Sequence, residues 1–243
     1  MNAPVYLAPF APGGEAGIDA ATCERLLSIC MSKGGDYADL FFEYRRGGSF
    51  AFDEGILKSA SRSTSVGLGV RVQKGDATGF AFVQELTWDA MKRAAETAAR
   101  IAAEGGHPHG VALQPRALPK RYELDDYSIH APSSDKRELL ERASKAALAV
   151  DSTIVRAEAS FSEALREVLV ATSDGVLTFD VQPMIRFGVL ATAEKGDKRQ
   201  SGSSGGGGRM TMGYFDDKSP EWHAEEAARR AIVMLDAQEA PAG

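Results

Sequence analysis

The first stretch that could do chemistry is a glycine-rich segment in the C-terminal third of the chain. Residues 199–215 read RQSGSSGGGGRMTMGYF, and the four consecutive glycines are Gly205, Gly206, Gly207 and Gly208. A phosphate-binding loop would need Lys and then Ser or Thr directly after its last glycine. Here Arg209 follows, so nucleotide binding is disfavoured. Two interpretations stay open: a linker, or a functional loop over 202–208 whose missing side chains let another backbone approach closely.

Histidines could bind a metal or act in catalysis, but their spacing matches no zinc-binding arrangement. The histidines are His107, His109, His130 and His223, and the chain contains no HExxH motif. His223 lies near Glu225 and Glu226, a pattern typical of a solvent-exposed helix face. No Ser/His/Asp or Cys/His arrangement is legible either. We therefore predict no catalytic residue and no metal ligand in this chain.

The cysteines and the overall charge limit the compartment and the partners. Cys23 and Cys30 lie about two turns apart on one predicted helix, too far for a disulfide. Reduced, buried thiols are expected, which fits the cytoplasm. A net charge of −6 argues against a protein that neutralises nucleic-acid phosphates. No apolar run approaches the roughly 20 residues that span a bilayer, so neither nucleic acid nor a membrane is expected as a partner.

An internal duplication predicts the fold. Residues 55–76, GILKSASRSTSVGLGVRVQKGD, resemble residues 175–197, GVLTFDVQPMIRFGVLATAEKGD. Each copy is preceded by a helical pattern and a strand, and each is followed by a helix with a Trp near its start. The fold class is therefore α+β, with two helix–antiparallel strands–helix units that share one core. The predicted organisation is a flexible arm (1–18), a first repeat (19–104), a connector (105–134) and a second repeat (135–243).

Local signals place several elements. Asp19 is a plausible N-cap for the first helix, and Ser219 with a following proline starts the last one. The KGD sequences at 74–76 and 195–197 predict turns between strands. Arg71 and Arg186 interrupt apolar strands and are expected to face solvent. The aromatic pairs are expected in the core: Phe41 and Phe42, Phe50 and Phe52, Phe80 and Phe82.

Several segments together resemble the N-terminal half of the TldD/PmbA peptidase family. They are YADLFFEY, VGLGVRVQKGDATGFAF, ATSDGVL, GDKRQSGSSGGGGR and VMLDAQEAPAG, in this order along the chain. The resemblance covers nearly everything after the first 17 residues. It implies a zinc-dependent peptidase that acts on unfolded peptides in the cytoplasm and works as a dimer, either a TldD/TldE-type pair or two copies of one chain.

The same resemblance separates this chain from the family's chemistry. In the family, an HExxxH helix and a cysteine hold the zinc downstream of the segments matched here, so no metal ligand transfers to a residue of this chain. We expect a truncated product, one piece of a split enzyme or a fragment, inactive alone and without bound zinc. A non-enzymatic module that pairs with a homologous TldD/PmbA-type protein is the alternative.

The resemblance also gives the glycine-rich segment a role. The candidate substrate or interface residues are Gly205, Gly206, Gly207, Gly208 and Arg209. The glycines would accept an extended peptide or a second domain, and Arg209 would pair with a substrate carboxylate or with an acidic residue across a domain boundary. If the segment is an exposed loop, valine at Gly206 and Gly207 should leave stability nearly unchanged.

Overall fold

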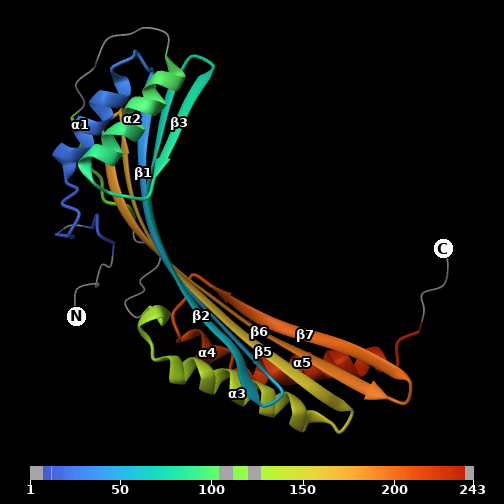
Figure 1. Ribbon diagram of the computed structural model, residues 1–243. Helices are drawn as coiled ribbons and strands as arrows, with labels where there is room; N and C mark the ends of the chain where they lie inside the picture. The colour runs from blue at the N-terminus through green and yellow to red at the C-terminus, as the bar shows by residue number, and fades with distance from the viewer. Residues whose placement is uncertain (1–7, 12, 104–111, 120–126, 239–243) are drawn as a thin grey trace. The chain divides into compact units, whose positions relative to one another are not determined.

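Helices cover strands in both parts of the chain, as the computed structural model in Figure 1 shows; it describes residues 8–11, 13–103, 112–119 and 127–238. The helices are α1 (Ala20–Met31), α2 (Trp88–Ala102), α3 (Ser133–Val150), α4 (Tyr214–Asp217) and α5 (Pro220–Leu235), with a 3₁₀ turn η1 (Ser128–His130). The strands are β1 (Tyr37–Asp53), β2 (Ile56–Lys74), β3 (Ala77–Val83), β4 (Gln114–Pro115), β5 (Ile154–Thr172), β6 (Val176–Lys195) and β7 (Lys198–Gly208).

The strand order confirms the α+β class. Neighbouring strands follow the order β3-β2-β1-β5-β6-β4, and β7 pairs with β6. The β2–β3 and β6–β7 pairs are antiparallel, whereas β4 runs parallel to β6. Along the chain, α1, three strands and α2 are followed by α3, three long strands and α5, so the element order agrees with the predicted duplication.

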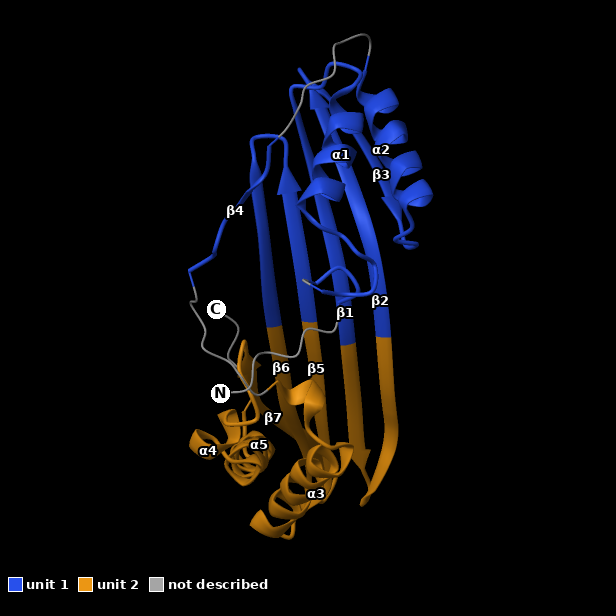
Figure 2. Ribbon diagram, turned by 90° about the vertical axis from the view of Figure 1, so that its left-hand side faces the viewer, with its two compact units in different colours: residues 1–46, 64–123, 166–182 blue, residues 47–63, 124–165, 183–243 orange. Residues whose placement is uncertain are grey.

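Two compact units divide the chain (Figure 2). Unit 1 comprises 1–46, 64–123 and 166–182, and unit 2 comprises the remaining segments: 47–63, 124–165 and 183–243. Strands β1, β2, β5 and β6 each contribute residues to both units. The units therefore do not coincide with the repeats, and the predicted repeat boundaries stay predictions. The buried side chains form two hydrophobic clusters, one per unit, instead of the single shared core that the sequence predicts.

Unit 1 packs α1 and α2 on its strands. The Asp19 carboxylate accepts a hydrogen bond from the backbone amide of Thr22, which caps α1 as expected. Several residues of the segment expected to be an arm lie in this core: Phe10 is buried, with its ring centroid 5.7 Å from that of Phe42. Residues 1–7 and 12 of the expected arm lie outside the described part of the chain.

The expectation for Phe80 and Phe82 is wrong. Their side chains are 60% and 59% exposed, because both point to the face of β3 away from α2. There they cover glycines of the neighbouring strand: a Cβ on Gly67 would lie 2.7 Å from the Phe82 ring. Phe42, Phe50 and Phe52 are buried as predicted. Arg71 is exposed but forms an ion pair with Asp39 at 2.7 Å.

Only part of the connector 105–134 is described. Residues 114–115 form β4, whose Gln114 amide donates to the carbonyl of Gly175. His107 and His109 lie outside the described residues. His130 ends η1 and lies against Tyr127, with ring centroids 5.9 Å apart.

Unit 2 packs α3 and α5 along one face of its strands (Figure 1). The Ser219 hydroxyl accepts from the backbone amide of Trp222, and Pro220 is the first helical residue, which confirms the predicted start of α5. The apolar face of α5 is formed by small side chains and ends at Leu235. Small residues let the helix approach the sheet closely.

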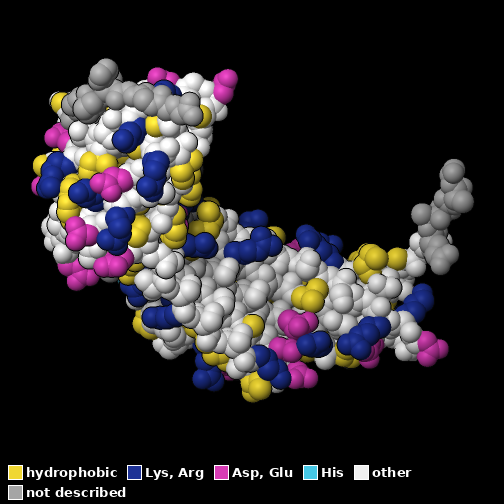
Figure 3. All heavy atoms as spheres, turned by 45° about the horizontal axis from the view of Figure 1, so that its top comes forward, with side chains coloured by type: hydrophobic (Ala, Val, Ile, Leu, Met, Phe, Trp, Pro, Cys, Tyr) yellow, Lys and Arg dark blue, Asp and Glu magenta, His cyan; other side chains and the backbone are white. Residues whose placement is uncertain are grey.

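Charged side chains of both signs are interspersed over the face shown in Figure 3. Within the described part of the chain, no helix has the length and apolar composition needed to cross a membrane.

Candidate functional site

The glycine-rich segment forms an edge strand, so the predicted loop over 202–208 is corrected. It is the second half of β7, paired antiparallel with β6 from Lys195↔Lys198 to Ile185↔Gly208. Gly202 and Ser204 are buried, whereas Ser201 and Ser203 are exposed. This alternation shows that one face of the strand packs inward and the other faces solvent.

The glycines of β7 make room for helices and for the neighbouring strand. A Cβ on Gly202 would lie under 3.0 Å from backbone atoms of α5, and one on Gly206 would overlap the hydroxyl of Tyr214. Gly207 has φ +135°, and a Cβ there would overlap the carbonyl of Ile185. Valine at Gly206 and Gly207 is therefore expected to destabilise the fold, contrary to the expectation for an exposed loop.

His223 links β7 to the two C-terminal helices. It is 1% exposed, so the expected solvent-facing position is wrong. Its Nδ1 is hydrogen-bonded to the Ser204 hydroxyl at 2.9 Å, and its Nε2 to the Tyr214 hydroxyl at 2.8 Å. Burial and, secondarily, the charge of Lys218 lower the pKa of His223, which favours the neutral ring. This cluster fixes the buried face of β7.

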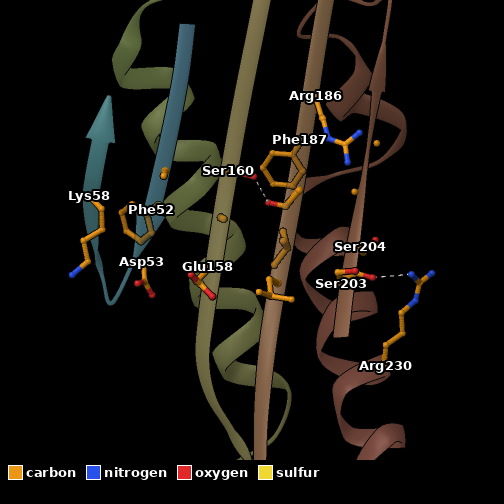
Figure 4. Close-up of a pocket in the computed structure, with 17 residues that line it drawn as sticks. Phe52, Asp53, Lys58, Glu158, Ser160, Arg186, Phe187, Ser203, Ser204 and Arg230 are labelled. Atoms are coloured by element: carbon orange, nitrogen blue, oxygen red, sulfur yellow. Dashed lines mark hydrogen bonds between the residues drawn. The ribbon is translucent and has the colours of Figure 1, made fainter. Parts of the chain in front are cut away.

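A groove of about 620 Å³ lies over unit 2 beside this strand (Figure 4). The polar side chains that line it are Asp53, Lys58, Glu158, Ser160, Arg186, Ser203 and Arg230, and Ser204 also belongs to the lining although its hydroxyl faces His223. Of the predicted site residues, Gly205 and Gly206 line the groove, whereas Gly207, Gly208 and Arg209 are outside its lining. In Figure 4 the helices lie behind the strands, so the groove lies on the face that they leave open.

Carboxylates outnumber cations at the β1–β2 end of the groove. Arg156 donates to both carboxylate oxygens of Asp53, at 3.0 and 2.7 Å, and also to Glu158 at 3.1 Å. The hydrogen bonds from Arg156 hold the pKa of Asp53 below its usual value. Lys58 pairs with Glu54 at 2.5 Å. At this end of the groove, three carboxylates therefore share two cations, Arg156 and Lys58.

The β6–β7 end is basic. Arg230 reaches from α5 to the edge of β7, where its Nη1 donates to the carbonyl of Ser203 at 2.8 Å. Arg186 projects from β6 and is exposed. Within the described part of the chain, the Arg186 guanidinium makes no hydrogen bond or ion pair. Its guanidinium is therefore available to a ligand.

The sequence carried a signal for the groove that local patterns did not resolve. Glu158 and Ser160 alternate with the buried Ala157, Ala159 and Phe161 along β5. Such alternation marks a strand with one solvent-facing side. It does not identify the strands that lie beside it, so the groove itself could not be found from sequence.

The residues described do not form a zinc site. Across the described ranges, no three His, Cys, Asp or Glu side chains lie close enough together to hold a metal ion. Both cysteines are buried, and burial raises the pKa of Cys23 and of Cys30 to about 12, which disfavours the thiolate that a metal needs. No catalytic step is therefore assigned to the described residues.

Comparison with known families identifies two consecutive domains. Residues 38–102 match the first domain of the PmbA/TldA metallopeptidases, and residues 126–235 match their central domain. The metalloprotease TldD homologue of Haemophilus influenzae is 31% identical over 238 residues, which is 94% of this chain and 49% of that protein. The TldD homologue of Buchnera aphidicola from Acyrthosiphon pisum is 31% identical over 216 residues, 86% of this chain and 44% of that protein.

Solved structures share the fold. A proposed modulator of a DNA gyrase from Thermotoga maritima superposes with a TM-score of 0.71 at 17% identity, covering 92% of this chain and 50% of that one. TldE from Thermococcus kodakarensis gives a TM-score of 0.66 at 20% identity, covering 87% of this chain and 47% of that one. The chain thus spans about half the length of the relatives that it matches.

Proposed function

The chain belongs to the PmbA/TldD metallopeptidase family, and on this basis we propose that it is the N-terminal portion of a TldD-like zinc metallopeptidase that hydrolyses unfolded peptides. The observation that carries the proposal is the match to the first and central domains of the family, in order, over most of the chain. In this proposal, the zinc ligands and the general base belong to the part of the relatives that this chain does not match.

The role we propose for this portion is to hold an extended peptide at the groove of unit 2. Gly205 faces the groove without a side chain, so a peptide main chain can come close there, and Gly206 also belongs to the groove lining. The carbonyl of Ser203 points to the outer edge of β7, where it accepts from Arg230. Residues two apart on a strand point the same way, so Ser201 and Gly205 present their backbone groups to that edge too. Main-chain hydrogen bonds suit substrates of varied sequence.

The remaining site residues are proposed as a junction. Gly207 and Gly208 end β7 and Arg209 follows them, all outside the groove lining, where they would meet the peptidase portion or a partner subunit. We propose a dimer, with a TldE/PmbA-like homologue or a second copy as the partner, and a cytoplasmic location. The location is supported by the expected reduced thiols, since both cysteines are free.

The test adds the C-terminal half of a relative to this chain as a separate polypeptide. The purified chain, the C-terminal half of the Haemophilus influenzae homologue and their mixture are each incubated with an unfolded peptide, and zinc is measured by elemental analysis. We expect chelator-sensitive cleavage by the mixture alone, and no stoichiometric zinc in the isolated chain. The full-length Haemophilus protein is the positive control.

Two results would count against the proposal. Chelator-sensitive cleavage by the isolated chain would contradict the assignment of catalysis to the other portion. A stable complex that cleaves nothing, beside an active control, would instead favour the non-enzymatic pairing module.

A further inference from the structure

We propose that the groove of unit 2 selects peptides that carry a carboxylate, and that Arg186 is the residue that recognises it. This inference rests on the proposed function because it names the substrate class of the same groove. Its occupant is an extended peptide segment with an Asp or Glu side chain.

Arg186 is placed on the open face by the strand pattern of β6. Its neighbours Ile185 and Phe187 are 1% exposed and point into the core, so Arg186 points the other way. Opposite it on β7 lies Gly207, and two residues further along β6 lies Gly188, opposite Gly205. Because these three glycines have no side chains, they leave the Arg186 guanidinium exposed on this face. Figure 4 shows Arg186 projecting from β6 beside the groove.

Each of the other charged side chains of the groove already has a partner. Asp53 and Glu158 bind Arg156, and Lys58 binds Glu54. Arg230 donates to a backbone carbonyl and lies 3.7 Å from Glu226. Arg186 is thus the groove cation that has no partner among the residues described.

The chemistry of an unpaired guanidinium defines the ligand. Its planar set of donors matches the two oxygens of a carboxylate, and such charge-assisted pairs are stronger than neutral hydrogen bonds. A carboxylate at Arg186 would have the hydroxyls of Ser160 and Ser203 and the half-exposed side chain of Leu190 along the same face. These neighbours suit a peptide better than a small ion, because they extend the contact beyond the charge.

The two ends of the groove also differ in charge, and this favours one orientation. The end with Asp53 and Glu158 has one carboxylate more than its cations, so it repels an acidic group. The end with Arg186 attracts it. An acidic peptide side chain is therefore directed toward β6 and β7, next to the backbone-only surface of Gly205.

The experiment measures binding without catalysis. Fluorescence anisotropy compares two labelled ten-residue peptides of Gly, Ser and Ala, capped at both ends, that differ in one central residue, Glu or Gln. We expect the unmodified chain to bind the Glu peptide about twofold to fivefold more tightly, the range of an exposed ion pair with good geometry. Arg186→Gln should bind both peptides equally, and Arg186→Glu should prefer a matched Lys peptide.

The matched control is Arg137→Gln, which removes the same charge from an exposed position on α3 outside the groove lining. It should keep the preference for the Glu peptide. All variants should melt like the unmodified chain, because Arg186 and Arg137 are exposed.

Three results would overturn the inference: equal binding of both peptides by the unmodified chain, a Glu preference that survives Arg186→Gln, or tighter binding of a short single-stranded oligonucleotide that Arg186→Gln abolishes. If the Glu preference holds but the mixed halves cleave no peptide, the proposed peptidase function fails while the carboxylate site stands.

Discussion

Gly202→Ala tests whether β7 is a packed strand or a loop. In the structure, an alanine Cβ at this position would lie 2.7 Å from Cβ of Arg230 and closer still to the Ala231 amide and the Ala227 carbonyl. All three groups belong to α5. A methyl group in a loop would meet none of them. The substitution therefore separates the two interpretations of the glycine-rich segment with one added carbon.

The magnitude follows from the size of the overlap. Carbon atoms normally pack about 3.5–4.0 Å apart, so α5 would have to move by about 1 Å along much of its contact with β7. Overpacking of this kind costs typically 1–3 kcal/mol, and we expect about 3 kcal/mol because the atoms in the way are backbone atoms of a helix. For a chain of this size, that loss lowers the melting temperature by about 6–12 °C.

The assay is thermal and urea unfolding of Gly202→Ala beside Gly188→Ala. Gly188 lies on β6 with no positive φ, and its nearest neighbour would be the Ser160 hydroxyl at an ordinary 3.4 Å. The control should change stability by less than about 0.5 kcal/mol. If Gly202→Ala unfolds within about 1 °C of the unmodified chain, α5 does not pack on β7 as described and the argument about the glycines is refuted.

Two further predictions concern buried ionisable groups of unit 2. Burial holds the pKa of His223 below 6.5 in the folded state, so the unfolded chain binds a proton at this residue more readily. The contribution of His223 to stability is therefore complete above pH 6.5 and is lost as the pH falls below that value. His223→Gln should flatten the decline in melting temperature between pH 7.5 and 5.5, and an unchanged decline would contradict this. Lys136→Met leaves the fully buried Glu163 carboxylate without its partner at 2.5 Å and should cost about 3–5 kcal/mol in urea unfolding, whereas adding Glu163→Leu should recover most of it. A single variant as stable as the unmodified chain would show that Glu163 does not need the Lys136 partner and would contradict this prediction.

The hairpin turns and helix starts could be predicted because the residues that decide them are local. The KGD sequences at 74–76 and 195–197 form the turns after β2 and β6, with Gly75 and Gly196 at positive φ. A glycine adopts that conformation without a steric cost. Capping by Asp19 and Ser219 likewise involves only the next three residues. Such features need no knowledge of the tertiary structure.

The errors concern residues whose environment is set by distant segments. A run of serine and glycine is typical of loops and linkers, but β7 is a strand because β6 pairs with it and α5 covers it. His223 has acidic neighbours in sequence, yet its partners Ser204 and Tyr214 lie 19 and 9 residues away. The exposed phenyl rings of Phe80 and Phe82 depend on which face of β3 the helices cover. The sequence shows that side chains alternate between the two faces of a strand, but only tertiary packing determines which face is buried.

The composition of β7 follows from having a helix on one face and a groove on the other. Toward the helices, Gly202 is small because the backbone of α5 occupies the space that a side chain would need, and Gly206 is small because the Tyr214 hydroxyl of α4 does. Toward the groove, Ser203 carries a small side chain and Gly205 none, which leaves the backbone accessible. Substitutions on the two faces should therefore have different effects: Gly202→Ala should lower stability, while a substitution at Ser203 or Arg186 should change peptide binding. In a loop, the effect of a substitution would not depend on such a face. Observing these two different effects would therefore support a strand that serves both packing and recognition.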